Sequence, residues 1–196
     1  LDSLVNCRYP KERMMVVLAF EERAGEGRKN LAEKLREEYS DKFSKLLLTF
    51  HPADIEGEIK GKGSNDAWAA RQAKERLIDP LGIDYERVIY SSFDIDTQVY
   101  PQYFGCITYH YLTANKPTRT SYQPIPLYNN NIWQAPVFSQ TSSFTGIFWQ
   151  IICQERPDQL VTFSSHSMSI KSLVDVGYKQ ENMVNEDSRI FWQCFF

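Results

Sequence analysis

The chain has 196 residues, of which 42% are hydrophobic and 24% charged, and its formal net charge is −3. This length suits one well-buried domain and is short for two. The slightly negative charge gives no overall basic footprint, which argues against nucleic acid as a partner. The four cysteines lie far apart without a C-x-x-C pair, which argues against a zinc knuckle and against a disulfide framework.

The ends of the sequence bear on its domain organisation. No secretory signal opens the chain, and no apolar run is long enough to cross a membrane. The chain starts without Met and stops inside the apolar helical pattern of residues 189–196. We therefore interpret residues 1–196 as a single catalytic domain truncated at both ends, taken from a longer protein.

The first part of the chain reads as a strand, a helix and a strand. The apolar run at residues 14–20 predicts a central parallel strand. Leu31, Leu35 and Tyr39 recur at spacings of four, which predicts an amphipathic helix packed on that sheet. A second apolar run at residues 46–50 predicts the next strand. This order is typical of a right-handed βαβ unit and favours a nucleotide-binding α/β domain.

A glycine-rich segment follows the second predicted strand. Gly61-Lys62-Gly63 leads into a predicted helix that runs through Ala73, with Ser64 or Asn65 as its N-cap. Lys62 would lie beside the helix N-terminus, which is a suitable place for a phosphate. The spacing is not that of a Walker A loop. A flexible turn with a solvated lysine is the alternative interpretation.

Two acids follow the next predicted strand. The apolar residues 88–90 lead into Asp94-Ile95-Asp96, and ligands of open α/β sheets bind outside the carboxyl ends of the strands. Two carboxylates placed there repel each other unless a cation lies beside them. Mg²⁺ usually takes one or two protein carboxylates plus phosphate and water oxygens. The pattern therefore indicates a metal that also binds substrate phosphates; alternatively, Asp94 ends the strand and Asp96 caps a helix.

Three further segments follow this acidic pair. An aromatic-rich helix is predicted at residues 103–112, and the Pro and Asn content of residues 120–131 predicts an irregular segment. Residues 138–153 predict a helix with apolar residues on most sides. That helix could be ordinary core, or it could lie in the surface of a membrane.

The last part of the chain predicts a strand and two helices. Residues 160–163 form the strand, and residues 169–176 form a helix that Gly177 ends. The final helix begins at Glu186-Asp187. Acids in a first helical turn are favoured by the helix dipole, so on its own this pair has a structural explanation.

The order of these motifs resembles that of inverting family 2 glycosyltransferases, the group that includes cellulose and hyaluronan synthases and polyprenyl-phosphate sugar transferases. Acids follow the first strand, Gly-Lys-Gly precedes a helix, Asp-x-Asp ends a strand and Glu-Asp begins a helix. The resemblance covers nearly the whole chain, and its specificity lies in the order of short motifs. It implies a GT-A fold, which is a Rossmann-like α/β domain with a mostly parallel central sheet flanked by helices.

The resemblance also implies a donor site for a UDP- or GDP-sugar. Glu21 would lie near the nucleotide, and Asp54 would contact the base. Lys62 would lie beside the nucleotide. Asp94 would approach the ribose or sugar and, with Asp96 as the better ligand, would hold Mg²⁺ or Mn²⁺.

For catalysis and the acceptor, the resemblance implies that Asp187 is the general base and that Glu186 and His166 contact the acceptor. The acceptor would be a saccharide or a lipid phosphate. The sequence departs from the family at Ser165-His166-Ser167, which replaces a more usual Gly-x-Asn or Gly-Ser-x stretch, so the acceptor contacts are the least supported. The Gln-x-x-Arg-Trp motif of processive synthases is absent from these residues.

The resemblance places the parent protein in a membrane, with this domain on the cytoplasmic face. Two other classes stay open. A nucleotidyltransferase also places paired acids at the end of a strand, but the glycine-rich signature expected after the first strand is missing, because Glu-Glu-Arg-Ala follows Phe20. A non-catalytic sugar- or nucleotide-binding module would need neither Asp187 nor a metal.

Overall fold

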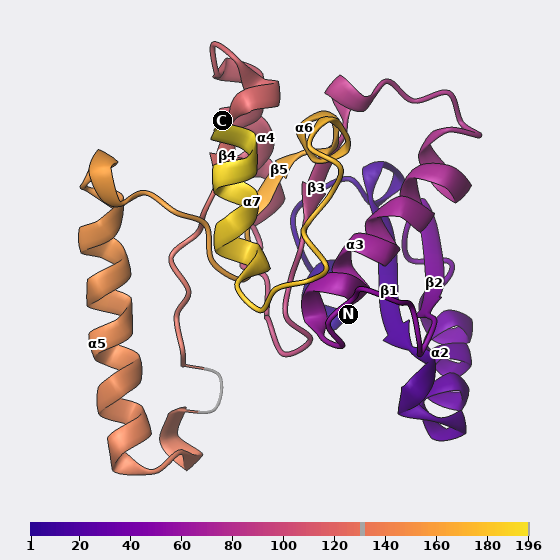
Figure 1. Cartoon of the computed structure of the whole chain (residues 1–196), viewed down its shortest axis with the longest axis horizontal. Coiled ribbons are helices and arrows are strands. Elements are labelled where there is room, and N and C mark those ends of the chain that lie inside the picture. Colours follow the sequence, from indigo (N-terminus) through magenta and orange to yellow (C-terminus); the bar gives the residue numbers. More distant parts are fainter. Residues whose placement is uncertain (130–131, 196) are drawn as a thin grey trace.

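The strands form two small sheets (Figure 1). The computed structural model describes residues 1–129 and 132–195. In the first sheet, β1 (Met15–Glu21) and β2 (Lys45–His51) pair in parallel. In the second, β5 (Ser167–Ser169) lies between β3 (Ile89–Ser91) and β4 (Ser121–Tyr122) and is antiparallel to both.

The predicted βαβ unit is confirmed. β1 and β2 are joined by α2 (Glu26–Tyr39), and the parallel register runs from Met15 opposite Lys45 to Glu21 opposite His51. α3 (Lys62–Ala73) also contacts both strands, and its N-terminus lies next to their carboxyl ends. This arrangement delivers the end of β1, the end of β2 and the start of α3 to one edge of the sheet.

The mixed α/β class is confirmed, but the expected mostly parallel central sheet is not what the described residues form. The predicted strand at 160–163 is absent from them. The Thr162 hydroxyl donates to the Asp187 carbonyl, and the Phe163 N–H donates to Gln123 Oε1 at 2.6 Å. These hydrogen bonds of the segment therefore go to a helix and a loop, and not to a neighbouring strand. The strand lies further along the chain, at β5, and it is antiparallel to its partner β3.

The main core lies under the end of α3. Ala70 and Ile78 pack against β5, against α6 (Ile170–Asp175) and against α7 (Glu186–Phe195). A π-helical turn at Lys74–Ile78 continues α3 into this core. Because α3, β5 and α7 share one apolar cluster, their polar ends are fixed relative to one another.

The remaining predicted elements are largely confirmed, and α4 (Tyr103–Thr113) is the aromatic-rich helix. The structure adds α1 (Asp2–Val5), which packs in a second cluster around Cys7 and Met14. Gly177 follows α6 with φ +77°, the left-handed conformation that ends helices. The predicted irregular segment contains β4 and otherwise lacks regular structure up to residue 129; residues 130–131 lie outside the described residues.

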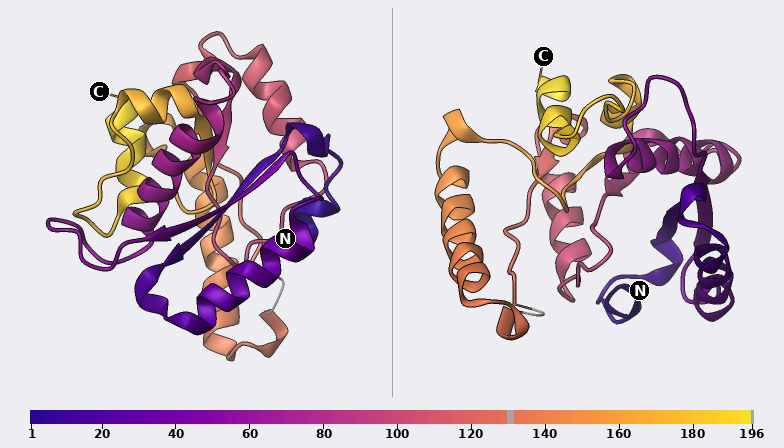
Figure 2. Two further views of the ribbon diagram at one scale, coloured as in Figure 1. Left: turned by 90° about the vertical axis from the view of Figure 1, so that its right-hand side faces the viewer. Right: turned by 60° about the horizontal axis from the view of Figure 1, so that its bottom comes forward.

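The helix α5 (Val137–Gln154) stands apart from the rest of the chain (Figures 1 and 2). On its inner side, Gln154 donates to the Gln123 carbonyl at 3.0 Å. Several large apolar side chains lie on its outer side, with Phe138 91%, Phe148 66% and Trp149 58% exposed. The helix is therefore not part of the core, and no helix among the described residues is long and apolar enough to span a bilayer.

Candidate functional site

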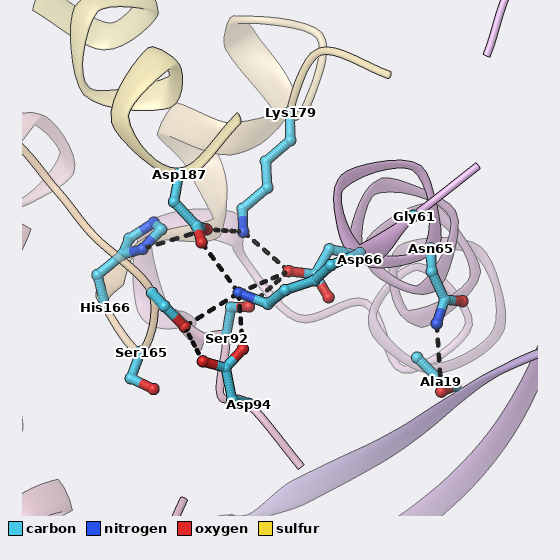
Figure 3. A network of polar contacts seen from close by, with 12 residues as sticks. Ala19, Gly61, Asn65, Asp66, Ser92, Asp94, Ser165, His166, Lys179 and Asp187 are labelled. Atoms are coloured by element: carbon cyan, nitrogen blue, oxygen red, sulfur yellow. Dashed lines mark hydrogen bonds and ion pairs between the residues drawn. The ribbon is translucent and has the colours of Figure 1, made fainter. Parts of the chain in front are cut away.

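Five charged side chains from three parts of the chain meet at the N-terminus of α3 (Figure 3). Lys62 and Asp66 come from the first turns of α3, and Asp94 follows β3. Lys179 lies between α6 and α7, and Asp187 is in the first turn of α7. Three of the five, Lys62, Asp94 and Asp187, are residues that the sequence motifs single out.

Lys62 is the hub of this cluster. Its ammonium lies 3.0 Å from Asp187 Oδ2, 3.2 Å from Asp94 Oδ1 and 3.9 Å from Asp66 Oδ2. It also donates to Ser164 Oγ at 3.2 Å. The positive end of the helix dipole disfavours a lysine at this position, so the carboxylates are what hold it there. Burial and Lys179 lower the pKa of Lys62, but Asp66 and Asp187 outweigh both, and the net shift is upward.

Lys179 is almost completely buried, with 2% of its surface exposed. Its ammonium lies 2.6 Å from Asp187 Oδ1 and 2.8 Å from Asp66 Oδ2. The Ser92 hydroxyl donates to the same Asp66 oxygen at 2.7 Å. Burial lowers the pKa of Lys179, but its acidic neighbours raise it further, so the lysine is charged. An isolated ammonium could not be buried at this depth, because desolvation costs several kcal/mol per ion.

Asp187 is held through both of its carboxylate oxygens, by Lys179 on Oδ1 and by Lys62 on Oδ2. Burial raises the pKa of this carboxyl, but the two ammonium groups outweigh burial and lower it. Asp187 is therefore ionised at neutral pH. A carboxylate in this state can accept a proton, once an oxygen is free to do so.

His166 lies beside Asp187, with Nδ1 at 3.9 Å from Asp187 Oδ1. Nδ1 donates to the Phe163 carbonyl at 2.8 Å, which identifies it as the protonated ring nitrogen. Burial and Lys179 lower the pKa of His166 to about 4, so the ring is neutral. The side chain is completely buried. Contact with an acceptor, the role that the resemblance implies, would require the surrounding loop to open.

Two residues next to the cluster have a strained backbone. Ser165 and Tyr178 have φ values of +64° and +74°, and they are the non-glycine residues with positive φ in the part of the chain that the structure describes. Ser165 precedes His166, and Tyr178 precedes Lys179. Such conformations cost of order 1–3 kcal/mol and persist where surrounding structure enforces them, often at functional sites. Here each one aims a side chain at Asp187.

The Glu186 side chain packs against α3, next to Gly63. It is 5% exposed, and burial raises its pKa. A Cβ added at Gly63 would lie 2.7 Å from Glu186 Cγ. The second glycine of Gly-Lys-Gly is therefore required by the close approach of α7. The predicted N-cap at Ser64 or Asn65 is wrong, and so is the alternative of a flexible turn, because α3 starts at Lys62 with Gly61 as its N-cap.

Substituting Gly63 by Ala should therefore reduce the free energy of unfolding by about 1–3 kcal/mol, the usual range for overpacking. The matched control is Gly61→Ala, because Gly61 has extended backbone and its added Cβ would meet nothing within 4 Å. We expect the control to change stability by less than about 1 kcal/mol. Urea unfolding of both variants measures the difference, and equal midpoints would contradict the steric explanation.

Glu21 and Asp54 lie at the sheet edge formed by β1 and β2. A depression there is lined by Glu21, His51, Glu58 and Gly61, among others. Glu21 forms an ion pair with Arg23. Asp54 is exposed, and its Oδ1 lies 3.0 Å from the ammonium of Lys60; Lys60 also lines the depression. Gly61 joins this depression to the charge cluster, because Lys62 is the next residue.

Asp94 and Asp96 occupy the loop after β3. The Ser164 hydroxyl donates to Asp94 Oδ2, and the Asp94 side chain is 43% exposed. Asp96 is exposed. Within residues 1–129 and 132–195, no group of three or more His, Cys, Asp or Glu side chains is arranged to hold a metal. Carboxylates are suitable ligands for Mg²⁺, and one or two suffice when substrate phosphates and water supply the rest. The pair thus fits a metal shared with substrate.

Sequence reasoning missed Asp66 and Lys179. A signal for Asp66 exists, because it lies four residues after Lys62 and such pairs share a helix face. Lys179 has no comparable signal. It is separated from Asp66 by 113 residues, and its neighbours in the sequence carry no motif.

No family model, curated protein or solved structure matches the chain. The class of protein is therefore argued from the site itself.

Proposed function

We propose that the chain is the catalytic domain of an inverting glycosyltransferase of the GT-A type, which uses a nucleoside-diphosphate sugar. One observation carries this proposal. The ammonium of Lys62 lies within 3.2 Å of both Asp94 and Asp187, so three residues of separate sequence motifs share one site. The parallel βαβ unit and the placement of this site beside α3 support the finer fold assignment.

The donor would bind along the edge formed by β1, β2 and α3. Its diphosphate would lie at the N-terminus of α3, where backbone N–H groups and Lys62 attract anions. The nucleoside, uridine or guanosine, would extend toward the depression near Glu21 and Asp54, which lies at the carboxyl ends of the strands.

Asp94 and Asp96 would hold Mg²⁺ or Mn²⁺. When bound, the metal supplies positive charge that stabilises the departing nucleoside diphosphate. Lys62 adds a second positive charge on the same side. Asp96 is exposed, whereas Asp94 has Lys62 at Oδ1 and the Ser164 hydroxyl at Oδ2, so these two partners would have to move when Asp94 binds the metal.

Asp187 would act as the general base. The acceptor hydroxyl attacks the anomeric carbon from the face opposite the diphosphate and forms the new C–O bond as the bond to the diphosphate breaks. Its proton passes to Asp187, and the configuration at the anomeric carbon inverts. The acceptor would enter on the side of Glu186 and His166. A saccharide would supply the hydroxyl proton that Asp187 takes, whereas a lipid phosphate would attack through an oxygen that is already ionised and would not need the base.

A thermal-shift screen tests this proposal. UDP- and GDP-sugars, with and without Mn²⁺ or Mg²⁺, would be compared with nucleoside triphosphates on the wild type and on Asp96→Ala. A ligand that binds only the folded state adds about 2.7 kcal/mol of stability at 100 times its Kd. We expect a nucleotide-sugar shift that requires metal and disappears in Asp96→Ala. A shift with triphosphates alone would instead support a nucleotidyltransferase, and a metal-independent sugar shift a binding module.

We also propose that the protein works at the cytoplasmic face of a membrane. The exposed side of α5 supports this, because residues 137–154 contain no charged side chain and Phe148 and Trp149 point outward. The hydroxyls of Thr141 and Thr145 donate to carbonyls one turn back, which leaves that side with few unpaired polar groups. Flotation with neutral phosphatidylcholine vesicles tests this, and equal binding by Phe148→Glu would contradict it.

A further inference from the structure

Asp187 faces a difficulty as a base in the state described here, and the inference that follows rests on the proposed function. A general base needs a lone pair within reach of the acceptor proton. Both carboxylate oxygens of Asp187 are instead occupied by ammonium groups, Oδ1 by Lys179 at 2.6 Å and Oδ2 by Lys62 at 3.0 Å. One of the two lysines must leave before Asp187 can accept a proton.

The two lysines differ in how firmly they are held. The Lys179 side chain is 1% exposed, and it bridges Asp187 and Asp66. Asp66 is in turn fixed by the Ser92 hydroxyl. The Lys62 side chain is 32% exposed and divides its contacts among three carboxylates and Ser164. Lys62 is therefore the lysine that can move, and Lys179 is the one that stays.

We propose that Lys179, held by Asp66, is a positioning residue that fixes Asp187 through Oδ1, while Lys62 covers Oδ2 until the donor diphosphate draws it away. Donor binding then exposes Oδ2 and removes one positive neighbour from Asp187. The base becomes competent only when the donor is present, which protects it from an acceptor that arrives first. No motif of the sequence assigns a role to Lys179 or Asp66.

Charge accounting supports this order of events. Lys62 and Lys179 carry two positive charges against three negative charges on Asp66, Asp94 and Asp187. When Lys62 turns to a diphosphate, the buried group of Lys179, Asp66 and Asp187 retains one net negative charge. A carboxylate in such a group binds a proton more readily than one between two lysines. Among the described residues, His166, Glu186 and Tyr90 are further titratable groups that face Asp187 or its partners.

Two nearly isosteric variants test the positioning role with opposite expected results. Lys179→Met removes a positive charge from Asp187, so the pKa of Asp187 should rise and the acidic limb of the pH–kcat profile should move to higher pH. Asp66→Asn removes a negative charge, so the same limb should move to lower pH. Loss of orientation in Lys179→Met should also lower kcat by about 10²-fold, with the donor KM within about threefold of the wild type.

The controls separate positioning from simple structural support. Lys171→Met removes an exposed lysine that is paired with Asp175, and it should leave kcat and the acidic limb unchanged. A structural role of Lys179 alone would reduce the unfolding temperature without moving the limb. The proposal would be overturned if the acidic limb of the pH–kcat profile shifted in the same direction in Lys179→Met and Asp66→Asn. It would also be overturned if the limb shifted in neither variant.

A measurement without turnover distinguishes failure of this inference from failure of the proposed function. The carboxyl ¹³C signal of Asp187 reports its pKa directly by NMR in the wild type, Lys179→Met and Asp66→Asn. Addition of UDP or GDP with Mg²⁺ should raise that pKa in the wild type, because Lys62 turns to the diphosphate. If the pKa of Asp187 shifts as expected in the two variants but no nucleotide sugar is turned over, the positioning role is supported and the proposed function is wrong. If turnover occurs and the pKa does not respond, the inference falls alone.

Discussion

Replacing Asp187 by Asn should reduce sugar transfer by about 10²–10⁴-fold, the usual contribution of a general base. The amide has nearly the same shape, and its oxygen can still accept from Lys179, while its NH2 group replaces the oxygen that faces Lys62. The change therefore removes the ability to take a proton and also one negative charge between the two lysines. In the proposed function the donor binds along the edge formed by β1, β2 and α3, so the donor Kd should stay within about threefold of the wild type.

The measurement is kcat together with the donor Kd, obtained by calorimetry on the same preparation. Asp175→Asn is the matched control, because Asp175 is an exposed acid in α6 whose partner is Lys171. It should leave both constants unchanged. Loss of donor binding along with turnover in Asp187→Asn would show that Asp187 belongs to the donor site and is not the base.

Lys62→Met should weaken donor binding and lower kcat, each by about ten- to hundredfold. A hydrogen bond to a charged group contributes about 1.5–3 kcal/mol, and Lys62 is the ammonium placed at the N-terminus of α3. Met has a similar length without the charge, so steric effects are small. Asp94 and Asp187 would also lose the cation between them and would repel each other.

Lys42→Met is the matched control for this prediction. Lys42 is exposed, its ammonium lies 3.1 Å from Asp41 Oδ2, and it is not among the residues that line the depression. Donor Kd and kcat would be measured for both variants across a range of salt concentrations. A Lys62→Met variant that binds the donor as tightly as the wild type would remove Lys62 from the donor site, whatever happens to the control.

Local sequence patterns predicted most individual elements. The apolar run of β1, the periodic face of α2 and Gly177 at the end of α6 each carry their signal within a few residues. The arrangement of the sheets was not accessible in this way. β5 is three residues long, and its antiparallel partner β3 lies about 80 residues away, so neither length nor periodicity indicates which strands pair or in which direction.

The candidate site shows the same division. Lys62, Asp94 and Asp187 were found because their motifs are local and their order is familiar. Lys179 was missed because its role in the site depends on its burial. That burial results from the packing of α3, β5 and α7, which no local pattern indicates. The burial of Glu186 and His166 could not be predicted from the sequence either. Their contacts with an acceptor stay predictions, and these contacts require the loop around His166 and α7 to rearrange.

The distance along the chain between the members of the charge cluster sets when the site can exist. Lys62 and Asp187 are separated by 125 residues, and Lys179 and Asp66 by 113. During synthesis the start of α3 leaves the ribosome long before Lys179 and Asp187 do, since chains emerge from the N-terminus onward. The βαβ unit can therefore form early, while the charge cluster waits until Lys179 and Asp187 have been made. A nascent chain released before Lys179 would keep the residues of its first sheet and lack the complete charge cluster.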